Sequence, residues 1–168
     1  MREISAGVII YRRAPARNAT HSVAGGPPRQ DLQVRGGGPE LKFLILYHGR
    51  GYWNFPKGKI ESEEKSWEAA VREVHEETGL KLSDLKFRKN FKAYEKFIFQ
   101  RQKEKVFKIV IFYLAEGKRA EIRLSKEHDG FGWFTYKEAI KILGRYRDSQ
   151  RVLTQAYEFI KRGEQKEA

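Results

Sequence analysis

The sequence contains no cysteine, so it can form no disulfide and no cysteine-bound zinc or iron–sulfur site. Any metal ion must therefore be held by oxygen or by histidine. The sequence also lacks a run of about 18 apolar residues, the length needed to span a membrane. Its first residues, MREISAGVIIYRR, include an acidic residue and too short an apolar stretch for a signal peptide. We therefore expect a cytoplasmic protein with no membrane partner.

Size and charge narrow the expectation further. At 168 residues, against roughly 150 residues per domain, the chain should form a single domain over residues 1–168. Lys and Arg outnumber Asp and Glu by 34 to 22, and the net charge of +12 favours anionic partners such as nucleotides, inositol phosphates or nucleic acid. The same charge is equally consistent with Lys and Arg that only solvate helix faces. No residue pattern indicates an oligomeric state.

The distribution of apolar residues predicts an α/β (α+β) fold with a mixed central sheet. Between the first two predicted strands, residues 14–40 are rich in Gly and Pro and keep neither a helix nor a strand period, so we expect a long flexible loop. Residues 100–104 are expected at the tip of a hairpin. Predicted strands cover 6–13, 41–48, 86–100, 105–115 and 131–136, and predicted helices cover 63–78, 137–143 and 149–162.

The predicted helix at 63–78 carries the first chemical signal. Its apolar stripe consists of Trp67, Val71 and Val74. Ser62 is a candidate N-cap, the acidic residues 63 and 64 would occupy the first turn, and Gly79 is a candidate left-handed C-cap.

Three glutamates, Glu73, Glu76 and Glu77, follow at spacings of three and four residues, on the face opposite the apolar stripe. They repel one another, and the negative end of the helix dipole adds to the cost. A hard divalent cation such as Mg²⁺ would relieve this repulsion, because such ions prefer oxygen ligands. The alternative is a glutamate-rich surface helix whose carboxylates are only solvated. His75 has no second histidine four residues on, which argues against a histidine-based metal site.

Residues 58–80, GKIESEEKSWEAAVREVHEETGL, resemble the Nudix box at each of its fixed positions. Gly58 is followed after five residues by Glu64, and after seven more by the run REVHEETGL. The resemblance implies the Nudix fold, an α/β/α sandwich in which a loop, a helix and a second loop bind divalent metal. It also implies an enzyme that hydrolyses a phosphoanhydride bond of a nucleoside-diphosphate-linked substrate.

By this resemblance, the chain uses Mg²⁺ or Mn²⁺ and water to cut its substrate. The implied metal ligands are the carbonyl of Gly58 and the side chains of Glu73, Glu76 and Glu77. Arg72 would orient Glu73 through a charge-assisted hydrogen bond, and Glu64 would have a supporting role. Water would attack phosphorus in line while a carboxylate accepts its proton.

The flanking segments resemble one Nudix subfamily, the asymmetrically cleaving diadenosine tetraphosphate hydrolases. The similar segments are AGVIIYRR, WNFPKGKIE, KIVIFYLAE and EIRLSKEHDGFGWFTYKEA. In that subfamily two lysines, here Lys57 and Lys108, point at the polyphosphate, and aromatic residues sandwich an adenine. The aromatic candidates, each equally consistent with a core position, are Tyr94, Phe97, Phe99 and Phe131.

Three features depart from the subfamily pattern. The loop at 14–40 is longer than usual, Gly51 and Tyr52 stand where animal members tend to have histidine, and the hairpin at 94–105 is unusually basic. These departures bear on the identity of the substrate and leave the expected chemistry unchanged.

A fourth carboxylate is expected from the stretch SKEH at 125–128, which resembles a serine-to-histidine stretch of the same subfamily. Glu127 in this stretch could bind a second metal or take the proton of the attacking water. Glu116 and Glu121 are its rivals, and a solvated loop glutamate is the alternative.

The expected activity is the hydrolysis of a dinucleoside polyphosphate, with diadenosine tetraphosphate cut to ATP and AMP. Nucleoside triphosphates, inositol pyrophosphates and triphosphorylated RNA ends are alternative substrates within the family. A binding module for nucleotides or RNA on the same scaffold would suit the basic charge, so nucleic acid is a possible partner. The complete set of box carboxylates favours an enzyme over such a module.

Overall fold

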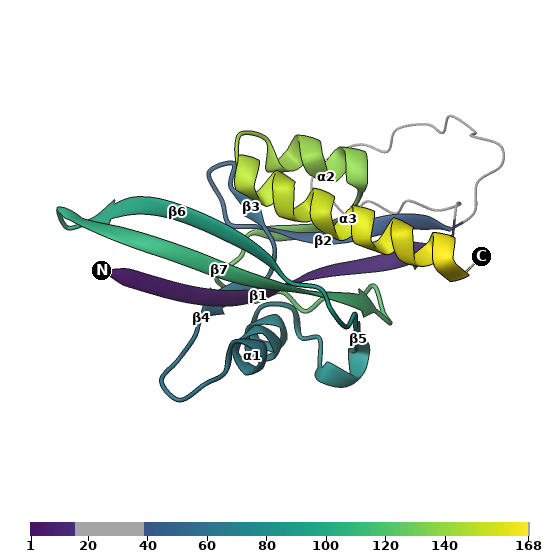
Figure 1. The fold of residues 1–168 in the computed structure, drawn as a ribbon, viewed down its shortest axis with the longest axis horizontal. Coiled ribbons are helices and arrows are strands. Elements are labelled where there is room, and N and C mark those ends of the chain that lie inside the picture. The colour runs from purple at the N-terminus through teal and green to yellow at the C-terminus, as the bar shows by residue number, and fades with distance from the viewer. Residues whose placement is uncertain (16–38, 168) are drawn as a thin grey trace.

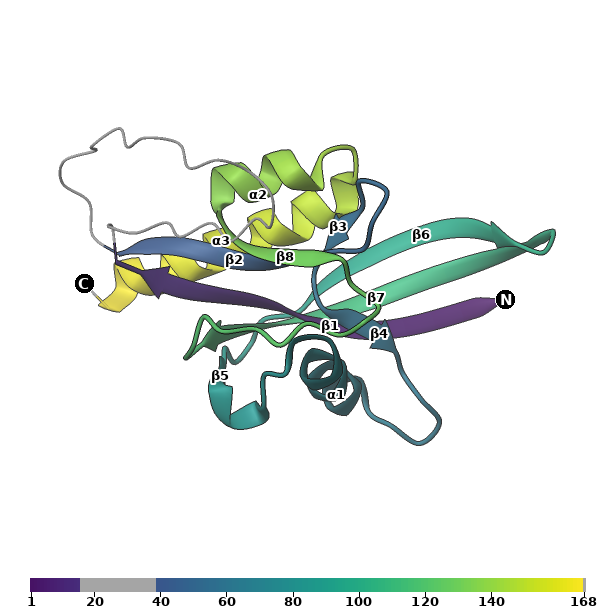
Figure 2. The same cartoon turned by 180° about the vertical axis from the view of Figure 1, so that it is seen from behind.

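The structure is a computed structural model that describes residues 1–15 and 39–167. Its main feature is a mixed β-sheet with helices on both faces (Figures 1 and 2). The strands are β1 (Arg2–Ala14), β2 (Glu40–Tyr47), β3 (Trp53–Asn54), β4 (Lys57–Lys59), β5 (Leu85–Phe87), β6 (Ala93–Arg101), β7 (Glu104–Gly117) and β8 (Gly130–Thr135). The helices are α1 (Ser66–Thr78), α2 (Tyr136–Leu143) and α3 (Arg147–Glu167), with a 3₁₀ helix η1 (Leu82–Asp84).

The sheet is mixed because its central pair is parallel and its other pairs are antiparallel. The strand order is β3-β2-β1-β7-β5, with β4 beside β1, β6 beside β7 and β8 beside β2. β1 runs parallel to β7, with Ile4 opposite Ile109. Residues 5–11 of β1 are all buried, which explains why this strand reads as a nearly unbroken apolar run rather than an alternating one.

Each face of the sheet has its own apolar core, as the predicted α/β/α sandwich requires. Helix α1 covers one face, where its alanines and Val74 pack against Val8 and Leu44. Helices α2 and α3 cover the other face, where Ile9 and Phe112 meet Val152 and other residues of α3 (Figure 1). None of the helices in residues 1–15 and 39–167 is long and apolar enough to span a membrane.

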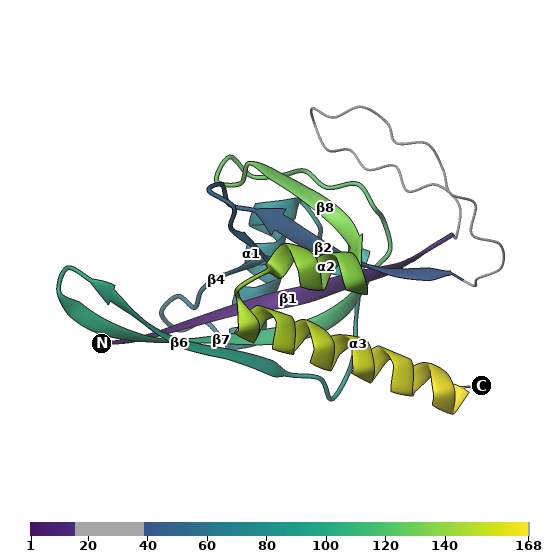
Figure 3. The ribbon, with the colours of Figure 1, turned by 90° about the horizontal axis from the view of Figure 1, so that it is seen from above.

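The hairpin of β6 and β7 extends past the helices, and the N-terminus lies beside it (Figure 3). Its turn lies at Gln102 and Lys103, both with positive φ, inside the predicted tip at 100–104. The terminal amine of Met1 donates a hydrogen bond to the carbonyl of Lys105 at 3.1 Å. The first residues of β1 are therefore fixed to the hairpin.

The predicted loop at 14–40 begins and ends inside the sheet, because Ala14 of β1 pairs with Glu40 of β2. Residues 16–38 lie outside the described residues.

The prediction of one strand over residues 86–100 is wrong. β5 ends at Phe87 and β6 begins only at Ala93. Between them Asn90 has a φ of 65°, a left-handed conformation that interrupts an extended strand. Phe91 turns inward and packs against Phe159 of α3, with ring centroids 5.3 Å apart.

The predicted start of the first helix is also wrong, because α1 begins at Ser66 rather than at residue 63, so Ser62 is not its N-cap. Glu63 has a φ of 69°, which is incompatible with a right-handed helix. The carboxylate of Glu68 instead accepts a hydrogen bond from the backbone N–H of Lys65 at 2.9 Å and closes the first turn. At the other end Gly79 has a φ of 73°, which confirms the predicted left-handed cap.

Candidate functional site

The turn before β4 brings the backbone of Gly58 against helix α1. β4 pairs with β1, where Gly7 lies opposite Lys57. A Cβ on Gly7 would clash with the carbonyl of Pro56, so glycine permits this close approach. A Cβ on Gly58 would overlap the carboxylate of Glu73. Glycine at position 58 therefore leaves room for a carboxylate directly beside the backbone.

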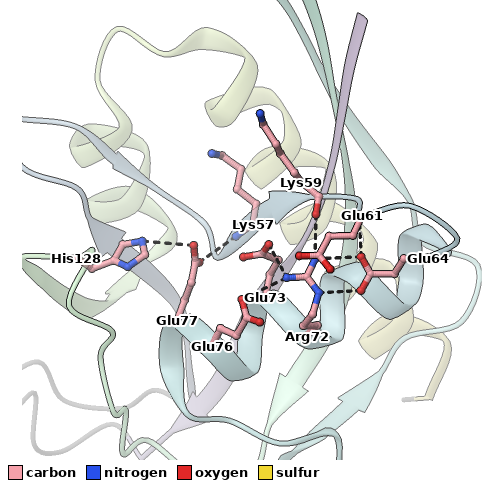
Figure 4. A network of polar contacts seen from close by, with 9 residues as sticks. All are labelled: Lys57, Lys59, Glu61, Glu64, Arg72, Glu73, Glu76, Glu77 and His128. Atoms are coloured by element: carbon pink, nitrogen blue, oxygen red, sulfur yellow. Dashed lines mark hydrogen bonds and ion pairs between the residues drawn. The ribbon is translucent and has the colours of Figure 1, made fainter.

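Arg72 is the centre of a network that fixes this carboxylate (Figure 4). Its guanidinium donates to both oxygens of Glu64, at 2.8 and 3.0 Å, and to the carbonyl of Lys59 at 2.9 Å. The same group donates to Glu73 at 2.9 Å and to Glu76 at 3.2 Å. Such a planar fork of donors can orient several oxygens at once. The hydrogen bonds from Arg72 to Glu64 hold the residues before α1 in a turn, and the helix therefore begins later than predicted.

Glu77 is buried, with an exposed fraction of only 7%. One carboxylate oxygen accepts a hydrogen bond from the backbone N–H of Lys57 at 3.1 Å, and the other lies 3.6 Å from Nε2 of His128. Burial, and next the charge of Glu73, raise the pKa of Glu77 to about 8. Burial also raises the pKa of Glu73, against the opposing effect of Arg72.

The three carboxylates do not share one solvent-facing side of α1, contrary to prediction. The buried side of the helix consists of Ala69, Ala70, Val74, Glu77 and Thr78. Trp67 of the predicted apolar stripe is 40% exposed and packs against Phe87. Ala69 and Ala70 let α1 lie close to β1. The side of the helix that carries these small side chains therefore faces the sheet, and Glu77 is buried on the same side. Glu76 remains exposed.

The donor set fits a hard divalent cation. Glu73, Glu76 and Glu77 offer carboxylate oxygens, and Gly58 offers a backbone carbonyl next to Glu73. Within residues 1–15 and 39–167, no three acidic or histidine side chains already stand as a group of metal ligands. One oxygen of each carboxylate is already hydrogen-bonded, those of Glu73 and Glu76 to Arg72 and that of Glu77 to the backbone N–H of Lys57.

Glu127 is placed near this cluster by backbone contacts that the sequence could not reveal. The N–H of Ser125 donates to the carbonyl of Glu77 at 3.1 Å, which ties the loop before β8 to the end of α1. Glu127 is exposed, and its charge is close enough to Glu73 and Glu77 to raise the pKa of both.

The two rivals of Glu127 are less well placed. Glu116 forms an ion pair with Arg13 at 2.9 Å, at the end of β1 remote from Gly58. Glu121 is exposed, and the main charges that raise the pKa of Glu73 and Glu77 do not include it.

The site contains two histidines, His48 and His128, for which the sequence predicted no role. His128 is buried, and its Nδ1 lies 2.8 Å from the hydroxyl of Ser125, which orients the ring toward Glu77. His48 stands against it, with ring centroids 4.5 Å apart. Burial, followed by the charge of Lys57, lowers the pKa of His48 to about 4, and burial lowers that of His128. The SKEH stretch contains His128, whereas no residue pattern distinguishes His48.

The predicted phosphate-binding lysines lie on the sheet face opposite α1. Gly58 faces α1, so strand alternation turns its neighbours Lys57 and Lys59 to the other side, as Figure 4 shows. Lys108 of β7 is on that side too, since it lies two and four residues before the core residues Val110 and Phe112 and so shares their face of the strand.

The four predicted aromatic residues are not brought together. Phe97 lies opposite Lys108 in the ladder of β6 and β7, and Phe99 follows on the same face with its ring centroid 6.1 Å away. Tyr94 points to the opposite face of β6. Phe131 packs against the apolar core beneath α1.

Comparison with known proteins adds independent findings. A profile described as NUDIX domain matches residues 34–157. The asymmetrical bis(5'-nucleosyl)-tetraphosphatase of Mus musculus is 32% identical over 158 residues, which cover 92% of this chain and 92% of that protein. The protein of the same description from Sus scrofa is 35% identical over 130 residues, covering 71% and 81%. The crystal structure of a C. elegans Ap4A hydrolase binary complex superposes with a TM-score of 0.68 at 25% identity, covering 94% of this chain and 97% of the other.

Proposed function

The chain belongs to the Nudix family and is a pyrophosphohydrolase, and from this premise we propose that it hydrolyses a dinucleoside polyphosphate. The substrate is diadenosine tetraphosphate, the products are ATP and AMP, and the cofactor is Mg²⁺ or Mn²⁺. Support for the substrate comes from the relative of Mus musculus, an asymmetrical tetraphosphatase that is similar over 92% of both chains.

The observation that carries the proposal is the buried carboxylate of Glu77 beside Glu73. A raised pKa of about 8 means that the charged form of Glu77 is disfavoured in the metal-free protein. A divalent ion is the partner that would make both charges favourable. The backbone of Gly58 lies directly against the carboxylate of Glu73, so its carbonyl would add a further oxygen ligand there.

The acidic residues and Arg72 then share the work of the site. Glu73, Glu76, Glu77 and the carbonyl of Gly58 would hold the ion, and the hydrogen bond from Arg72 keeps Glu73 in place. The ion, when bound, neutralises phosphoanhydride oxygens and makes water more acidic. Burial lowers the pKa of His128, whose Nε2 lies 3.6 Å from the carboxylate of Glu77 on the buried side.

Hydrolysis requires water to attack one phosphorus atom while the bridging oxygen leaves on the other. Glu127 is the proposed acceptor of the proton of that water, because its carboxylate is exposed and lies close enough to Glu73 and Glu77 for its charge to raise their pKa. Lys57 and Lys108 attract the polyphosphate, and Phe97 and Phe99 offer rings on which a base can stack. Tyr94 and Phe131 remain weaker candidates for this contact.

The test is product analysis under magnesium. Diadenosine tetraphosphate, nucleoside triphosphates, inositol pyrophosphates and a triphosphorylated RNA end are compared at equal concentration, and products are separated by chromatography. Equal amounts of ATP and AMP from diadenosine tetraphosphate, together with the highest turnover, are the expected result. Two ADP molecules per substrate, or a preference for another class, would replace the proposed reaction. Loss of all turnover in EDTA is expected, and EDTA-resistant turnover would contradict the role of the metal.

A further inference from the structure

The extended end of the sheet carries one carboxylate surrounded by positive charges. Glu3 of β1 lies beside Lys108 of β7 in the parallel ladder, and Phe97 of β6 follows next across the sheet. The side chain of Glu3 is only 10% exposed. It stands on the same face as Lys57, outside the Nudix box and outside every segment that resembles the subfamily.

Three cations converge on this carboxylate. One oxygen accepts a hydrogen bond from Lys108 at 3.1 Å. The other oxygen lies 3.1 Å from Arg101 and 3.3 Å from Lys59. Although burial acts in the opposite direction, these three cations lower the pKa of Glu3. We call Lys59, Arg101 and Lys108 the basic cluster.

The basic cluster connects the metal-binding turn with the hairpin. Lys59 follows Gly58, and its carbonyl accepts a hydrogen bond from Arg72. Arg101 is the last residue of β6 before the hairpin turn and lies over the ring of Phe99, 5.2 Å from its centroid. Through Glu3, the turn that carries Gly58 is therefore linked to the end of β6.

The charges of the cluster are unbalanced. One carboxylate meets three cations, so two positive charges remain uncompensated. Lys59 is 60% and Arg101 46% exposed, while the carboxylate between them is largely covered. Each cation also has further N–H donors that Glu3 does not use. An anion that approaches from solvent would therefore find the N–H donors of the basic cluster already close to one another.

We propose that Glu3 is a positioning residue that gathers Lys59, Arg101 and Lys108 into an anion subsite for the phosphates of the substrate chain beyond the scissile bond. This inference rests on the proposed function, because it assigns the subsite to a polyphosphate chain. Holding the cations together in the free protein lowers the cost of ordering them when the chain binds. The subsite would favour substrates with more than two phosphates.

The test compares Arg101→Gln with Lys96→Gln. Both changes remove one positive charge from β6, but Lys96 is exposed on the opposite face of the strand, so its loss controls for net charge. In the hydrolysis of diadenosine tetraphosphate, Arg101→Gln should raise KM by about five- to tenfold and leave kcat within about twofold. Lys96→Gln should leave KM within about twofold of that of the wild type. Equal effects of the two variants would overturn the subsite.

Glu3→Gln tests the positioning role separately. If Glu3 gathers the cations, this variant should weaken substrate binding although it makes the surface more positive. The loss of affinity in the double variant with Arg101→Gln should then be much smaller than the product of the losses in the two single variants. Tighter binding by Glu3→Gln would show that the carboxylate competes with the anion and would overturn the proposal. A fully multiplicative double variant would also contradict it.

A titration with inorganic tripolyphosphate and pyrophosphate separates this inference from the proposed reaction. It is performed by calorimetry on protein freed of metal, so it requires no hydrolysis. Wild-type protein should bind tripolyphosphate more tightly than pyrophosphate, and Arg101→Gln and Glu3→Gln should lose about five- to tenfold of the tripolyphosphate affinity. That result without hydrolysis of diadenosine tetraphosphate would reject the proposed function and keep the subsite. Hydrolysis of diadenosine tetraphosphate, together with equal tripolyphosphate binding by all variants, would keep the proposed function and reject the subsite.

Discussion

The two sides of the sheet beside β4 carry clusters of opposite charge. In each cluster, several like charges surround one residue of the opposite charge. On the α1 side, Arg72 gathers the acidic residues Glu64, Glu73 and Glu76 around one guanidinium. On the other side, Glu3 gathers the basic cluster around one carboxylate. Each centre leaves a surplus of the charge that it collects. A divalent cation on the acidic side and a polyanion on the basic side would balance these charges, and both are required by the proposed reaction.

The two faces differ in how far apart their members lie in the sequence. The acidic residues and Arg72 fall within residues 64–77, and helical spacing alone brings most of them together. Glu3, Lys59, Arg101 and Lys108 come from four strands, and only strand pairing makes them neighbours. Lys59 joins both sides, since its carbonyl contacts Arg72 and its ammonium group contacts Glu3.

The largest expected effect comes from the acidic side. Glu76→Gln and Glu77→Gln should each reduce turnover at saturating Mg²⁺ by at least about a hundredfold, because each removes a charged ligand of the ion. The fold should be retained, and the metal-free protein should even gain stability from Glu77→Gln. Turnover and thermal unfolding are measured together. Turnover close to that of the wild type, combined with insensitivity to EDTA, would contradict the metal site.

Glu127→Gln should have the next largest effect. If its carboxylate accepts the proton of water, kcat falls by about a hundredfold while substrate affinity changes little. Glu116→Gln and Glu121→Gln serve as matched controls and should be nearly silent in turnover. An unchanged kcat in Glu127→Gln would mean that Glu127 is only a solvated loop glutamate without a role in catalysis.

Arg72→Lys should reduce turnover by about tenfold or more, because lysine keeps the charge but loses the planar fork that holds Glu64 and Glu73 together. Addition of a high Mg²⁺ concentration should restore part of the lost turnover, since the ligands themselves remain. Full turnover in Arg72→Lys at low Mg²⁺ would mean that charge alone, rather than geometry, is required on the acidic side.

The sequence predicts the acidic side better than the basic side for physical reasons. The long strands β1, β2, β7 and β8 and the body of the box helix follow from local periodicity, whereas the short strands β3 and β4, the break between β5 and β6 and the start of the helix do not. The burial of Glu77 does not follow from it either, because it depends on which side of α1 fits against β1. Glu127 and His128 reach the site through backbone bonds between a loop and the end of a helix. The contact of Glu3 with Arg101 joins residues 98 positions apart, and no local pattern signals it.

The dependence of stability on pH offers a weaker test of the acidic side. The pKa of Glu77 in the folded protein, about 8, lies above its ordinary value of 4.5. Its contribution to the stability of the metal-free protein is therefore fully present below about pH 4.5 and is lost as pH rises toward 8. Between pH 5 and pH 8 the free energy of unfolding of the wild type should fall, relative to that of Glu77→Gln, by on the order of 2 kcal/mol. Parallel curves for the two proteins would show that Glu77 titrates normally. The comparison with Glu77→Gln removes the opposite contribution of His48, which is lost as pH falls.

The smallest effect is expected far from both clusters, at the end of β1 opposite to Glu3. Ala14 and Glu40 pair directly, so the ends of the predicted loop are already neighbours and a short turn can join them. Replacing residues 16–38 with a tight Gly-containing turn should preserve turnover and the KM for diadenosine tetraphosphate. Stability should be unchanged or higher by about 1 kcal/mol, because closing a shorter loop costs less chain entropy. Calorimetry and steady-state kinetics check the two expectations on the same protein. A loss of cooperative unfolding would assign a structural role to residues 16–38. A raised KM with unchanged stability would mean that these residues contribute to substrate binding, and that the acidic and basic sides at β4 do not form the whole site.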